Sequence, residues 1–411
     1  MNRLPDNFLL VLLIYLPFQS FLINLLQKQT VWSESAVFWI THWYEPVVIG
    51  AFFVIFKRNL FRKGPVLPLI VAACALIILG IISVLFLSAD AGRALEGYRL
   101  NLMAVIILIL AWRDNAAGTI DRFKKIYLIV AVLVAFWALV ERFLPANYWA
   151  EWGLIPAGKG FGWGGFAVNP ILQSASIIGT PNQLGAYLLP AFFLLWFAYR
   201  RHKNRRYLFG LLLIGTAVIF TFSRSTFIGL IGGAFLALFL VPTQVWIRAA
   251  AGGVLILAVG AVELLNQNIG LWRDLVTHGA SQSEHYSAII NSWAEIVRRV
   301  DEPTQFLLGS GLGTAGPLAV KYGSGLISES WYFQLWLELG LIGLLLWLLL
   351  IYFVLRQLYR RGEVGLFAGI VAVSIAAALL HTWADNPALA ITLFVLAGSS
   401  LADRRVSKIA D

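Results

Sequence analysis

Long apolar segments separated by short polar links fill most of the chain, and this pattern predicts membrane-spanning helices. Because a helix needs roughly 20 apolar residues to cross the hydrocarbon core of a bilayer, the chain divides into about twelve spans. Their expected limits are 7–26, 36–56, 65–88, 98–112, 123–143, 183–199, 207–222, 226–241, 248–264, 331–355, 364–384 and 387–403. The fold class that follows is an all-α integral membrane protein, with its first apolar segment retained as a span.

Two long stretches interrupt this pattern, at 144–182 and 265–330. The first is glycine-rich at 158–165, which is typical of a connector without regular structure. The second contains apolar residues three or four apart, so we expect an amphipathic helix on the membrane surface or on the outer mouth of the bundle. These apolar residues are Tyr286, Ile289, Ile290, Trp293, Ile296, Val297 and Val300. We divide the chain into N-terminal membrane helices, 1–175, and a second membrane region, 176–411, that includes this loop.

Basic residues gather in the links that follow even-numbered spans. They are Lys57, Arg58, Arg62 and Lys63, then Arg113, Arg122, Lys124 and Lys125, then Arg200, Arg201, Lys203, Arg205 and Arg206, then Arg356, Arg360 and Arg361, and finally Arg404, Arg405 and Lys408. Since Lys and Arg are enriched in cytoplasmic links, both termini are expected in the cytoplasm. The two long loops then lie on the outer side of the cytoplasmic membrane.

Composition supports the membrane class and narrows the chemistry. Hydrophobic residues make up 60% of the chain and charged residues 13%, against about 25% charged residues in soluble domains. The net charge of +10 is carried mostly by the short links, which favours contact with anionic lipids over nucleic-acid binding. The single cysteine, Cys74, excludes a disulfide within the chain, and the five scattered histidines favour a metal-independent activity. No cofactor is expected.

Two charged residues at the ends of apolar segments are candidates for function, because charge near the membrane core is costly. Arg224 lies in a short outer link between serines, and its guanidinium can form paired hydrogen bonds to a phosphate. The alternative is an interfacial arginine that reaches the lipid headgroups. Glu329 lies two residues before the span at 331–355 and can act as a general base. The alternative there is an acidic residue favoured by the helix dipole.

Four further polar residues are weaker candidates. Glu338 lies well inside its span, must be paired or hydrogen-bonded there, and is expected to be structural. Arg273 and His285, in the second outer loop, can reach a ligand or can simply be solvated. Asn182 follows Pro181 at the start of a span, where both residues also favour a helix start.

Four segments in the second region follow a recognisable order: 181–187 (PNQLGAY), 221–225 (TFSRS), 306–313 (FLLGSGLG) and 329–343 (ESWYFQLWLELGLIG). They resemble the PNxxAxYL, SRS/SRG, PxxGxGxG and HNxYLQxLxELGxxG elements of the O-antigen ligase and polymerase superfamily. The resemblance covers about residues 176–356, and the N-terminal spans match only in hydropathy.

The resemblance implies a membrane glycosyltransferase that moves a glycan from a polyprenyl-diphosphate carrier to an acceptor hydroxyl at the outer face. It matches Arg224 to the family's diphosphate-binding arginine and places Glu329 where the family commonly has a catalytic histidine. Arg273 is the candidate for a further loop arginine, and His285 stands where an arginine is expected. Asn182 and Tyr332 match polar positions of the motifs and are taken as substrate-binding residues.

The acceptor stays open between another lipid-linked glycan, a lipid core, a wall polymer and a protein, so ligase and polymerase activities are not separated. A second class of function is a secondary transporter or a flippase of lipid-linked sugars. Transporters typically contain internal repeats and broken helices near the bilayer centre. The two halves of this chain show no such similarity, and a long outer loop adds little to alternating access.

Overall fold

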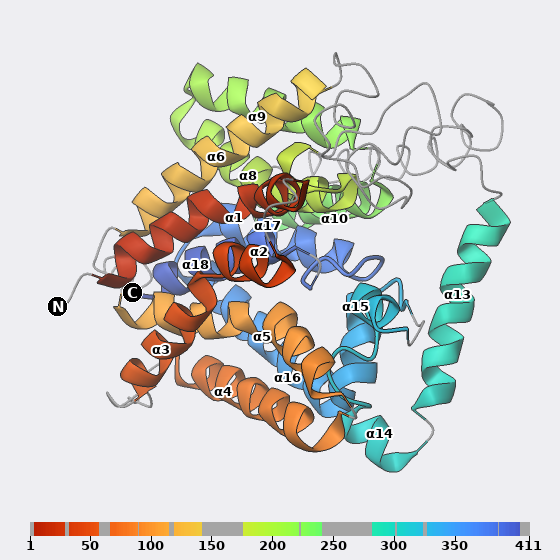
Figure 1. Ribbon diagram of the computed structural model, residues 1–411. Helices are drawn as coiled ribbons and strands as arrows, with labels where there is room; N and C mark the ends of the chain where they lie inside the picture. The colour runs from red at the N-terminus through yellow and green to blue at the C-terminus, as the bar shows by residue number, and fades with distance from the viewer. Residues whose placement is uncertain are drawn as a thin grey trace.

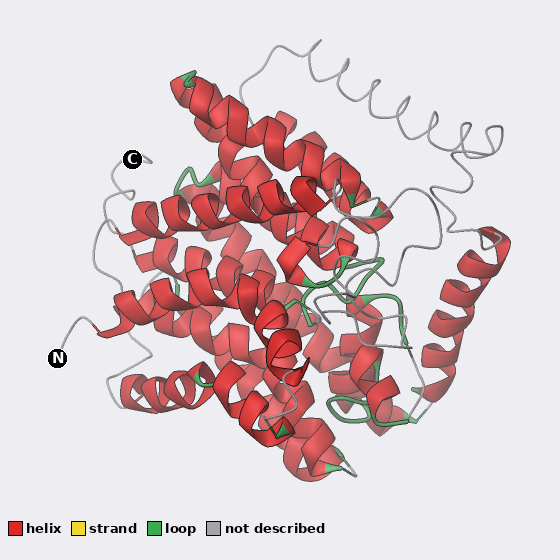
Figure 2. Ribbon diagram, turned by 45° about the horizontal axis from the view of Figure 1, so that its top comes forward, coloured by secondary structure: helices red, strands yellow, loops and turns green. Residues whose placement is uncertain are grey.

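The computed structural model describes residues 4–28, 33–56, 66–88, 90–114, 119–141, 176–221, 223–240, 282–300, 302–323, 327–384 and 386–402. Throughout these residues the regular structure is helical, without a β-strand (Figures 1 and 2). This confirms the all-α class. The helices are α1 (Leu4–Lys28), α2 (Glu34–Thr41), α3 (Tyr44–Phe56), α4 (Leu67–Ile82), a π-helical turn (Ser83–Leu87), α5 (Ala91–Asp114), α6 (Thr119–Glu141), a 3₁₀ turn (Ser176–Ile178), α8 (Pro181–His202), α9 (Arg205–Phe220), α10 (Arg224–Leu240), α13 (Gln282–Arg299), α14 (Pro303–Leu308), α15 (Gly316–Lys321), α16 (Trp331–Arg360), α17 (Val364–Ala376) and α18 (Pro387–Ala402).

Five of the described helices are long and apolar enough to cross a membrane: α1, α4 with its π-helical turn, α5, α6 and α16. The pair α2 and α3, bent by 52° at its break, makes a sixth if it is counted as one span. Helices α10, α17 and α18 are apolar but shorter. These helices fit a membrane-embedded protein. The count of twelve spans is not tested and stays a prediction, and the segment 248–264 lies outside the described residues.

The core of the bundle is built around α5 and α18, which pack along each other. Residues 101–111 of α5 and 388–401 of α18 are buried without interruption. A helix that is apolar on all sides is covered on all sides, and α4, α6, α8 and α16 supply neighbours for this pair. Large apolar side chains on outer helices are exposed instead, such as Phe86 at 77% and Phe209 at 67%, as expected of surfaces that face lipid.

Helix α16 is interrupted at Gly340, where φ is 69° and ψ is −176°. Only glycine adopts such angles without strain. The interruption frees backbone carbonyl groups, and the segment after α14 satisfies two of them. The amide of Ser310 donates to the carbonyl oxygen of Leu337 (2.7 Å), and the amide of Gly311 donates to that of Glu338 (3.1 Å). The glycines of two predicted motifs therefore meet at one backbone crossing.

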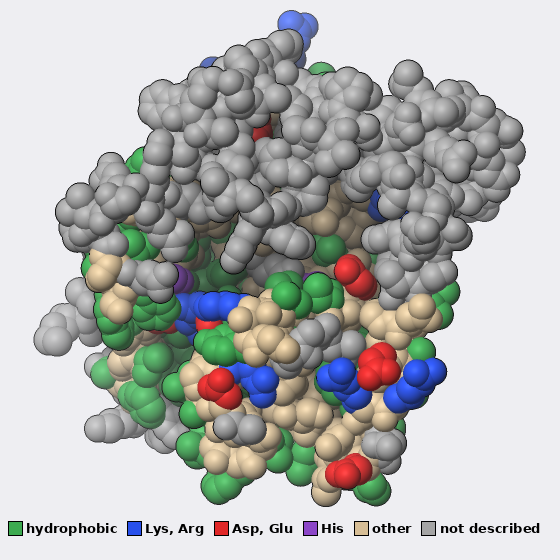
Figure 3. All heavy atoms as spheres, turned by 45° about the vertical axis from the view of Figure 1, so that its right-hand side comes forward, with side chains coloured by type: hydrophobic (Ala, Val, Ile, Leu, Met, Phe, Trp, Pro, Cys, Tyr) green, Lys and Arg blue, Asp and Glu red, His purple; other side chains and the backbone are tan. Residues whose placement is uncertain are grey.

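Helix α13 occupies the loop segment in which the sequence predicts an amphipathic helix, and it stands apart on the right of Figure 1. Its C-terminal part contacts the bundle, because Ile296 and Val300 pack in a small apolar cluster with Leu337. Two other residues of its apolar set, Ile290 and Val297, remain 61% and 51% exposed. Charged side chains gather on this side of the molecule (Figure 3).

Candidate functional site

The motif segments at 181–187, 221–225 and 329–343 come together at one end of the bundle, the end at which α8, α10, α16 and α18 begin. The fourth segment, 306–313, crosses α16 at Leu337 and Glu338. At the start of α8, the carbonyl oxygen of Gln183 accepts a hydrogen bond from the Asn386 side chain, next to α18 (2.8 Å). A Cβ atom at Gly185 would overlap the side chain of Thr226, near the start of α10. At the start of α16, the amide of Trp331 donates to the carbonyl oxygen of Ala377, directly after α17 (2.9 Å). We call this the site end.

Arg224 is the first residue of α10, and its neighbours hold the turn in place. The hydroxyl of Ser223 accepts hydrogen bonds from the amide and the hydroxyl of Thr226 (3.4 and 2.9 Å) and lies 3.2 Å from the hydroxyl of Ser225. The serines that flank Arg224 are therefore buried and bonded to one another. Their role here is to fix the start of the helix, as an N-cap does.

The side chain of Arg224 is half-buried, and it forms no ion pair with any residue in the described part of the chain. A cation is unfavourable at a helix N-terminus, because the helix dipole and the free amide groups there favour negative charge. The same position becomes favourable when an anion binds between the guanidinium and the helix start. The placement of Arg224 therefore suits an anionic ligand.

Glu329 lies two residues before α16 in a left-handed backbone conformation, with φ of 49°. This conformation costs a residue with a side chain roughly 1–2 kcal/mol, and such strain often accompanies functional positions. The side chain is half-buried, and burial raises the pKa of its carboxyl group above the ordinary value of 4.5. A carboxylate with a raised pKa is a better proton acceptor.

Arg224 and Glu329 both lie near the C-terminal end of α17. Helix α10 packs along α17, with Gly229 against Ala376, the last residue of α17. Glu329 is two residues from Trp331, whose amide bonds just beyond that residue, to Ala377. The structure thus brings both predicted residues to the site end.

The other predicted site residues have different positions. Asn182 is exposed near the start of α8, after Thr180, whose hydroxyl caps the helix by accepting from the amide of Gln183. The hydroxyl of Tyr332 donates to the carbonyl oxygen of Ser374 (2.7 Å), so this group already joins α16 to α17. Arg273 and the side chain of His285 lie outside the described residues.

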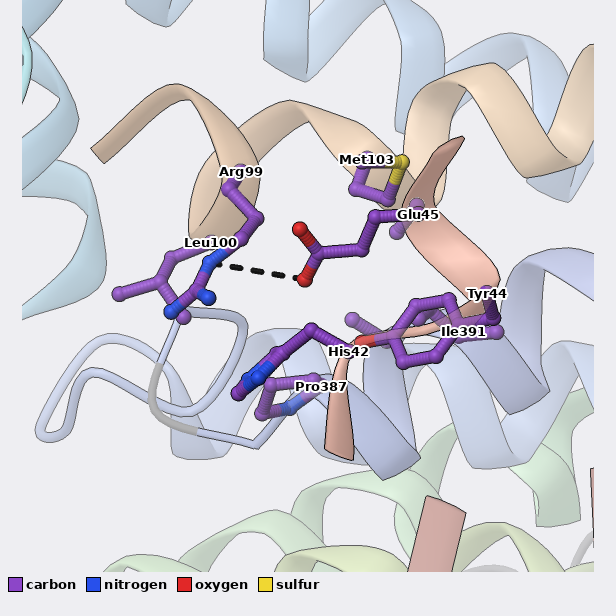
Figure 4. Close-up of a pocket in the computed structure, with 10 residues that line it drawn as sticks. His42, Tyr44, Glu45, Arg99, Leu100, Met103, Pro387 and Ile391 are labelled. Carbon is purple, nitrogen blue, oxygen red and sulfur yellow. Dashed lines mark ion pairs between the residues drawn. The ribbon is translucent and has the colours of Figure 1, made fainter. Parts of the chain in front are cut away.

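A charged cluster at the start of α5 was not identified from the sequence. Arg99 lies 3.6 Å from Glu45 of α3 and 3.5 Å from Glu96 (Nε–Oε1 and Nη2–Oε1 distances). Glu96 also accepts from Lys321 of α15 (3.0 Å) and from the hydroxyl of Tyr322 (3.0 Å). Figure 4 shows Arg99 and Glu45 facing each other across a small pocket between α3, α5 and α18. The sequence does contain a sign of this cluster, because charged residues recur at every third position in Arg93, Glu96 and Arg99.

A chain of buried polar side chains also crosses the bundle near the site end. Asn101 of α5 donates to Glu338 (2.7 Å), and the amide nitrogen of Gln334 donates to the other oxygen of Glu338 (3.3 Å). The amide oxygen of Gln334 lies 2.7 Å from Nδ1 of His381. This oxygen can only accept, so Nδ1 is the donor in this hydrogen bond. The expectation that Glu338 is hydrogen-bonded within its apolar helix is confirmed.

Within the described residues, no three His, Cys, Asp or Glu side chains are placed to hold a metal ion together. No protein-family model matches the chain, and no curated protein matches it either. The resemblance to the O-antigen ligase and polymerase superfamily therefore rests on the four motif segments alone.

Proposed function

We propose that the protein is a glycosyltransferase of the O-antigen ligase and polymerase type. In this reaction, a glycan passes from a polyprenyl-diphosphate carrier to an acceptor hydroxyl. The observation that carries the proposal is the position of Arg224, a cation without an ion-pair partner in the described part of the chain, at a helix N-terminus on the site end. A diphosphate supplies the negative charge that this position lacks.

The reaction divides into two tasks that the site end can perform. Glu329 accepts the proton of the acceptor hydroxyl while the oxygen of that hydroxyl attacks the anomeric carbon of the glycan. The bond between that carbon and the diphosphate oxygen breaks, and the electron pair leaves with the polyprenyl diphosphate. Arg224 stabilises the negative charge that builds on this leaving group. The diphosphate is already a good leaving group, so positioning and charge stabilisation supply the catalysis.

The proposal includes an arrangement in the membrane. About twelve spans cross the cytoplasmic membrane, with both termini in the cytoplasm and the site end on the outer side. The long loop between the ninth and tenth spans, with its amphipathic helix, then lies outside. The donor reaches the site from the lipid phase, and the acceptor is a glycan, a lipid or a protein.

The test is glycan transfer by purified protein, with lipid-linked oligosaccharides and acceptors extracted from the host membrane. Arg224→Gln is expected to lower kcat/KM by about 100- to 1,000-fold, as loss of a group that stabilises transition-state charge does. Arg224→Lys keeps the charge without the paired geometry and retains part of the activity. Glu329→Gln removes the base and lowers kcat by about 100- to 10,000-fold.

The pH dependence of the transfer rate is a second test of Glu329. The base must be ionised, so the rate of the wild-type protein falls as pH drops through its raised pKa, above 4.5. In Glu329→Gln this acidic limb disappears. Two exposed residues supply matched controls, Arg298→Gln on α13 and Glu302→Gln before α14, and both are expected to stay within about twofold of wild type, as surface changes do. Normal transfer by folded Arg224→Gln and Glu329→Gln proteins would contradict the site assignment.

Transport remains the competing function, because α16 is interrupted at Gly340 as transporter helices are. In transporters the freed carbonyl groups bind ions, whereas here Ser310 and Gly311 donate to the carbonyl oxygens of Leu337 and Glu338. Reconstituted vesicles separate the two functions. Movement of lipid-linked sugar across the bilayer without glycan transfer would favour transport.

A further inference from the structure

A cavity of about 220 Å³ lies beside the polar chain, between α5, α15 and α16. Asn101, Gln334 and Glu338 form one wall, Leu100 and Leu318 belong to the apolar part of the lining, and Lys321 also lines it. At a share of roughly 30 Å³ for each water molecule, this volume suits a small ring compound rather than a single ion or water. Neither Arg224 nor Glu329 lines this cavity.

The polar wall is built rigidly and offers hydrogen-bond acceptors. Glu338 is fully buried, and three donors fix its carboxyl group: the side chains of Asn101 and Gln334 (2.7 and 3.3 Å) and the amide of Ala315 (3.3 Å). The side-chain oxygen of Asn101 is buried as well and has no hydrogen-bond partner within the described residues. Buried polar atoms are rarely left without a partner, since this costs free energy. A ligand that fits here therefore brings hydroxyl donors.

Apolar residues make up another part of the lining. Leu100 and Leu318 line the cavity together with Pro317 and Ala384. A lining with both polar and apolar groups matches the two kinds of surface on a sugar ring, whose hydroxyl groups point outward and whose C–H groups cover the ring faces. Binding pockets for small ligands commonly combine an apolar lining with a few fixed polar groups.

The charges around the cavity disfavour an anionic ligand. The ammonium group of Lys321 is already paired with the carboxylate of Glu96, 3.0 Å away. Among the described residues, no other cationic side chain lines this cavity. The diphosphate of the proposed donor therefore does not belong here, and an uncharged ring does.

We propose that this cavity binds one uncharged sugar ring through Asn101, Gln334 and Glu338. Its assignment as the acceptor subsite rests on the proposed function. The cavity adjoins the first turns of α16, near Glu329, but neither Arg224 nor Glu329 lines it. Gln334 lies between Glu329 and the cavity. Its backbone N–H donates to the carbonyl oxygen of Ser330, next to Glu329, and its side chain lines the cavity.

Binding is measured by saturation-transfer NMR on the full-length protein in detergent, with a panel of methyl hexosides as probes. Two variants change the cavity in different ways: Asn101→Leu removes the unpartnered acceptor, and Ala384→Met fills the space without touching the polar wall. The matched control is Asn291→Leu, at an exposed position on α13. We expect transfer to at least one methyl hexoside with wild type and the control, a loss of at least tenfold in both cavity variants, and no transfer to methyl glucuronide.

Each result bears on the cavity separately from the proposed reaction. Wild-type protein that binds none of the hexosides, or cavity variants that bind them equally well, would overturn the inference. If Asn101→Leu does not fold, Ala384→Met decides. Glycan transfer without hexoside binding leaves the proposed function in place and removes the sugar site. Hexoside binding in the cavity without any glycan transfer leaves the sugar site in place and removes the proposed function. If both hold, Ala384→Met is expected to raise the acceptor KM more than it lowers kcat.

Discussion

At the scale of single residues, Gly309 and Gly340 determine how closely the segment after α14 can approach α16. A Cβ atom at Gly309 would lie 2.5 Å from the carbonyl carbon and oxygen of Glu338. A Cβ atom at Gly340 would overlap the carbonyl group of Leu307. Both glycines also have positive φ, 81° and 69°. The approach places Glu338 within reach of Asn101 and Ala315, so it supports the polar wall of the cavity.

We therefore expect Gly340→Ala to destabilise the protein more than a matched glycine substitution in open space. The matched position is Gly323, which has φ of 76° and no atom within 4 Å of an added Cβ. Gly323→Ala is expected to cost about 1–2 kcal/mol from backbone strain alone. Gly340→Ala adds roughly 1–3 kcal/mol, because backbone atoms must move apart. Thermal unfolding in a mild detergent, followed by circular dichroism, measures both. Equal shifts in the two variants would argue against the close approach.

Some residues of the site end stand out in the sequence and others do not, for a physical reason. Arg224 and Glu329 stand out in the sequence because they interrupt apolar segments, and both lie at helix starts on the site end. Glu96 does not stand out because it precedes the predicted span, which begins at residue 98. Arg99, at the second position of that span, resembles an ordinary interfacial arginine until its partners are known. Their stabilising partners are distant in sequence: Lys321 is 225 residues from Glu96. Pairs of this kind appear only when the chain is folded.

At the scale of helices, the packing of α10 on α17 and α8 depends on a face of small residues. A Cβ atom at Gly229 would lie 2.5 Å from the carbonyl oxygen of Ala372. One at Gly233 would lie 2.7 Å from the Cβ of Ala372 and 2.8 Å from the ring of Phe193. Small residues let membrane helices approach closely, and the contact then rests on van der Waals packing. The position of α10 in turn sets the position of Arg224.

Alanine substitutions in this face are expected to lower the stability of the protein, whereas an alanine substitution outside it is expected to raise it. Gly229→Ala and Gly233→Ala each lower the stability by about 1–3 kcal/mol, since the added methyl group forces the helices apart. Gly215→Ala in α9 meets only one side-chain atom, at 3.5 Å. It is expected to raise the stability by about 0.5–1 kcal/mol through helix propensity. The readout is the thermal midpoint of each purified variant, and a stabilising effect at Gly229 or Gly233 would refute the tight interface.

The ends of helices can be predicted from the sequence where charge and hydropathy change together. Where they do not change together, the predicted ends are wrong. The eleventh segment was expected to run to residue 384, but α17 ends at Ala376. Beyond it the chain turns, and the carbonyl oxygens of Ala377 and Leu380 accept from the amide of Trp331. The residues of this turn are as apolar as those of the helix, so hydropathy could not mark the boundary. The second segment was likewise expected to be continuous, but it bends by 52° between α2 and α3.

At the scale of the whole molecule, the two ends of the bundle have different polar chemistry. The site end contains Arg224, whose guanidinium forms no ion pair within the described residues, the half-buried Glu329 and the buried polar chain from Asn101 to His381. At the opposite end, Lys124 of α6 donates to both carboxylate oxygens of Glu363 (2.7 and 2.5 Å), just before α17. This pair joins helix ends rather than forming a cavity. The proposed function needs the site end on the outer side of the membrane, where polyprenyl-linked glycans are transferred.

Single-cysteine labelling tests this orientation directly. The chain has one native cysteine, Cys74, which is buried, so Cys74→Ala gives a background without thiols. Into it we place Glu302→Cys, exposed before α14, or Arg205→Cys, exposed at the start of α9. A membrane-impermeant maleimide added to intact cells is expected to label residue 302 and to label residue 205 only after the cytoplasmic membrane is permeabilised. The expectation follows from the general rule that links rich in Lys and Arg lie on the cytoplasmic side. The reverse pattern would place Arg224 and Glu329 in the cytoplasm, away from the donor, and the glycosyltransferase proposal would fail even if both side chains proved essential.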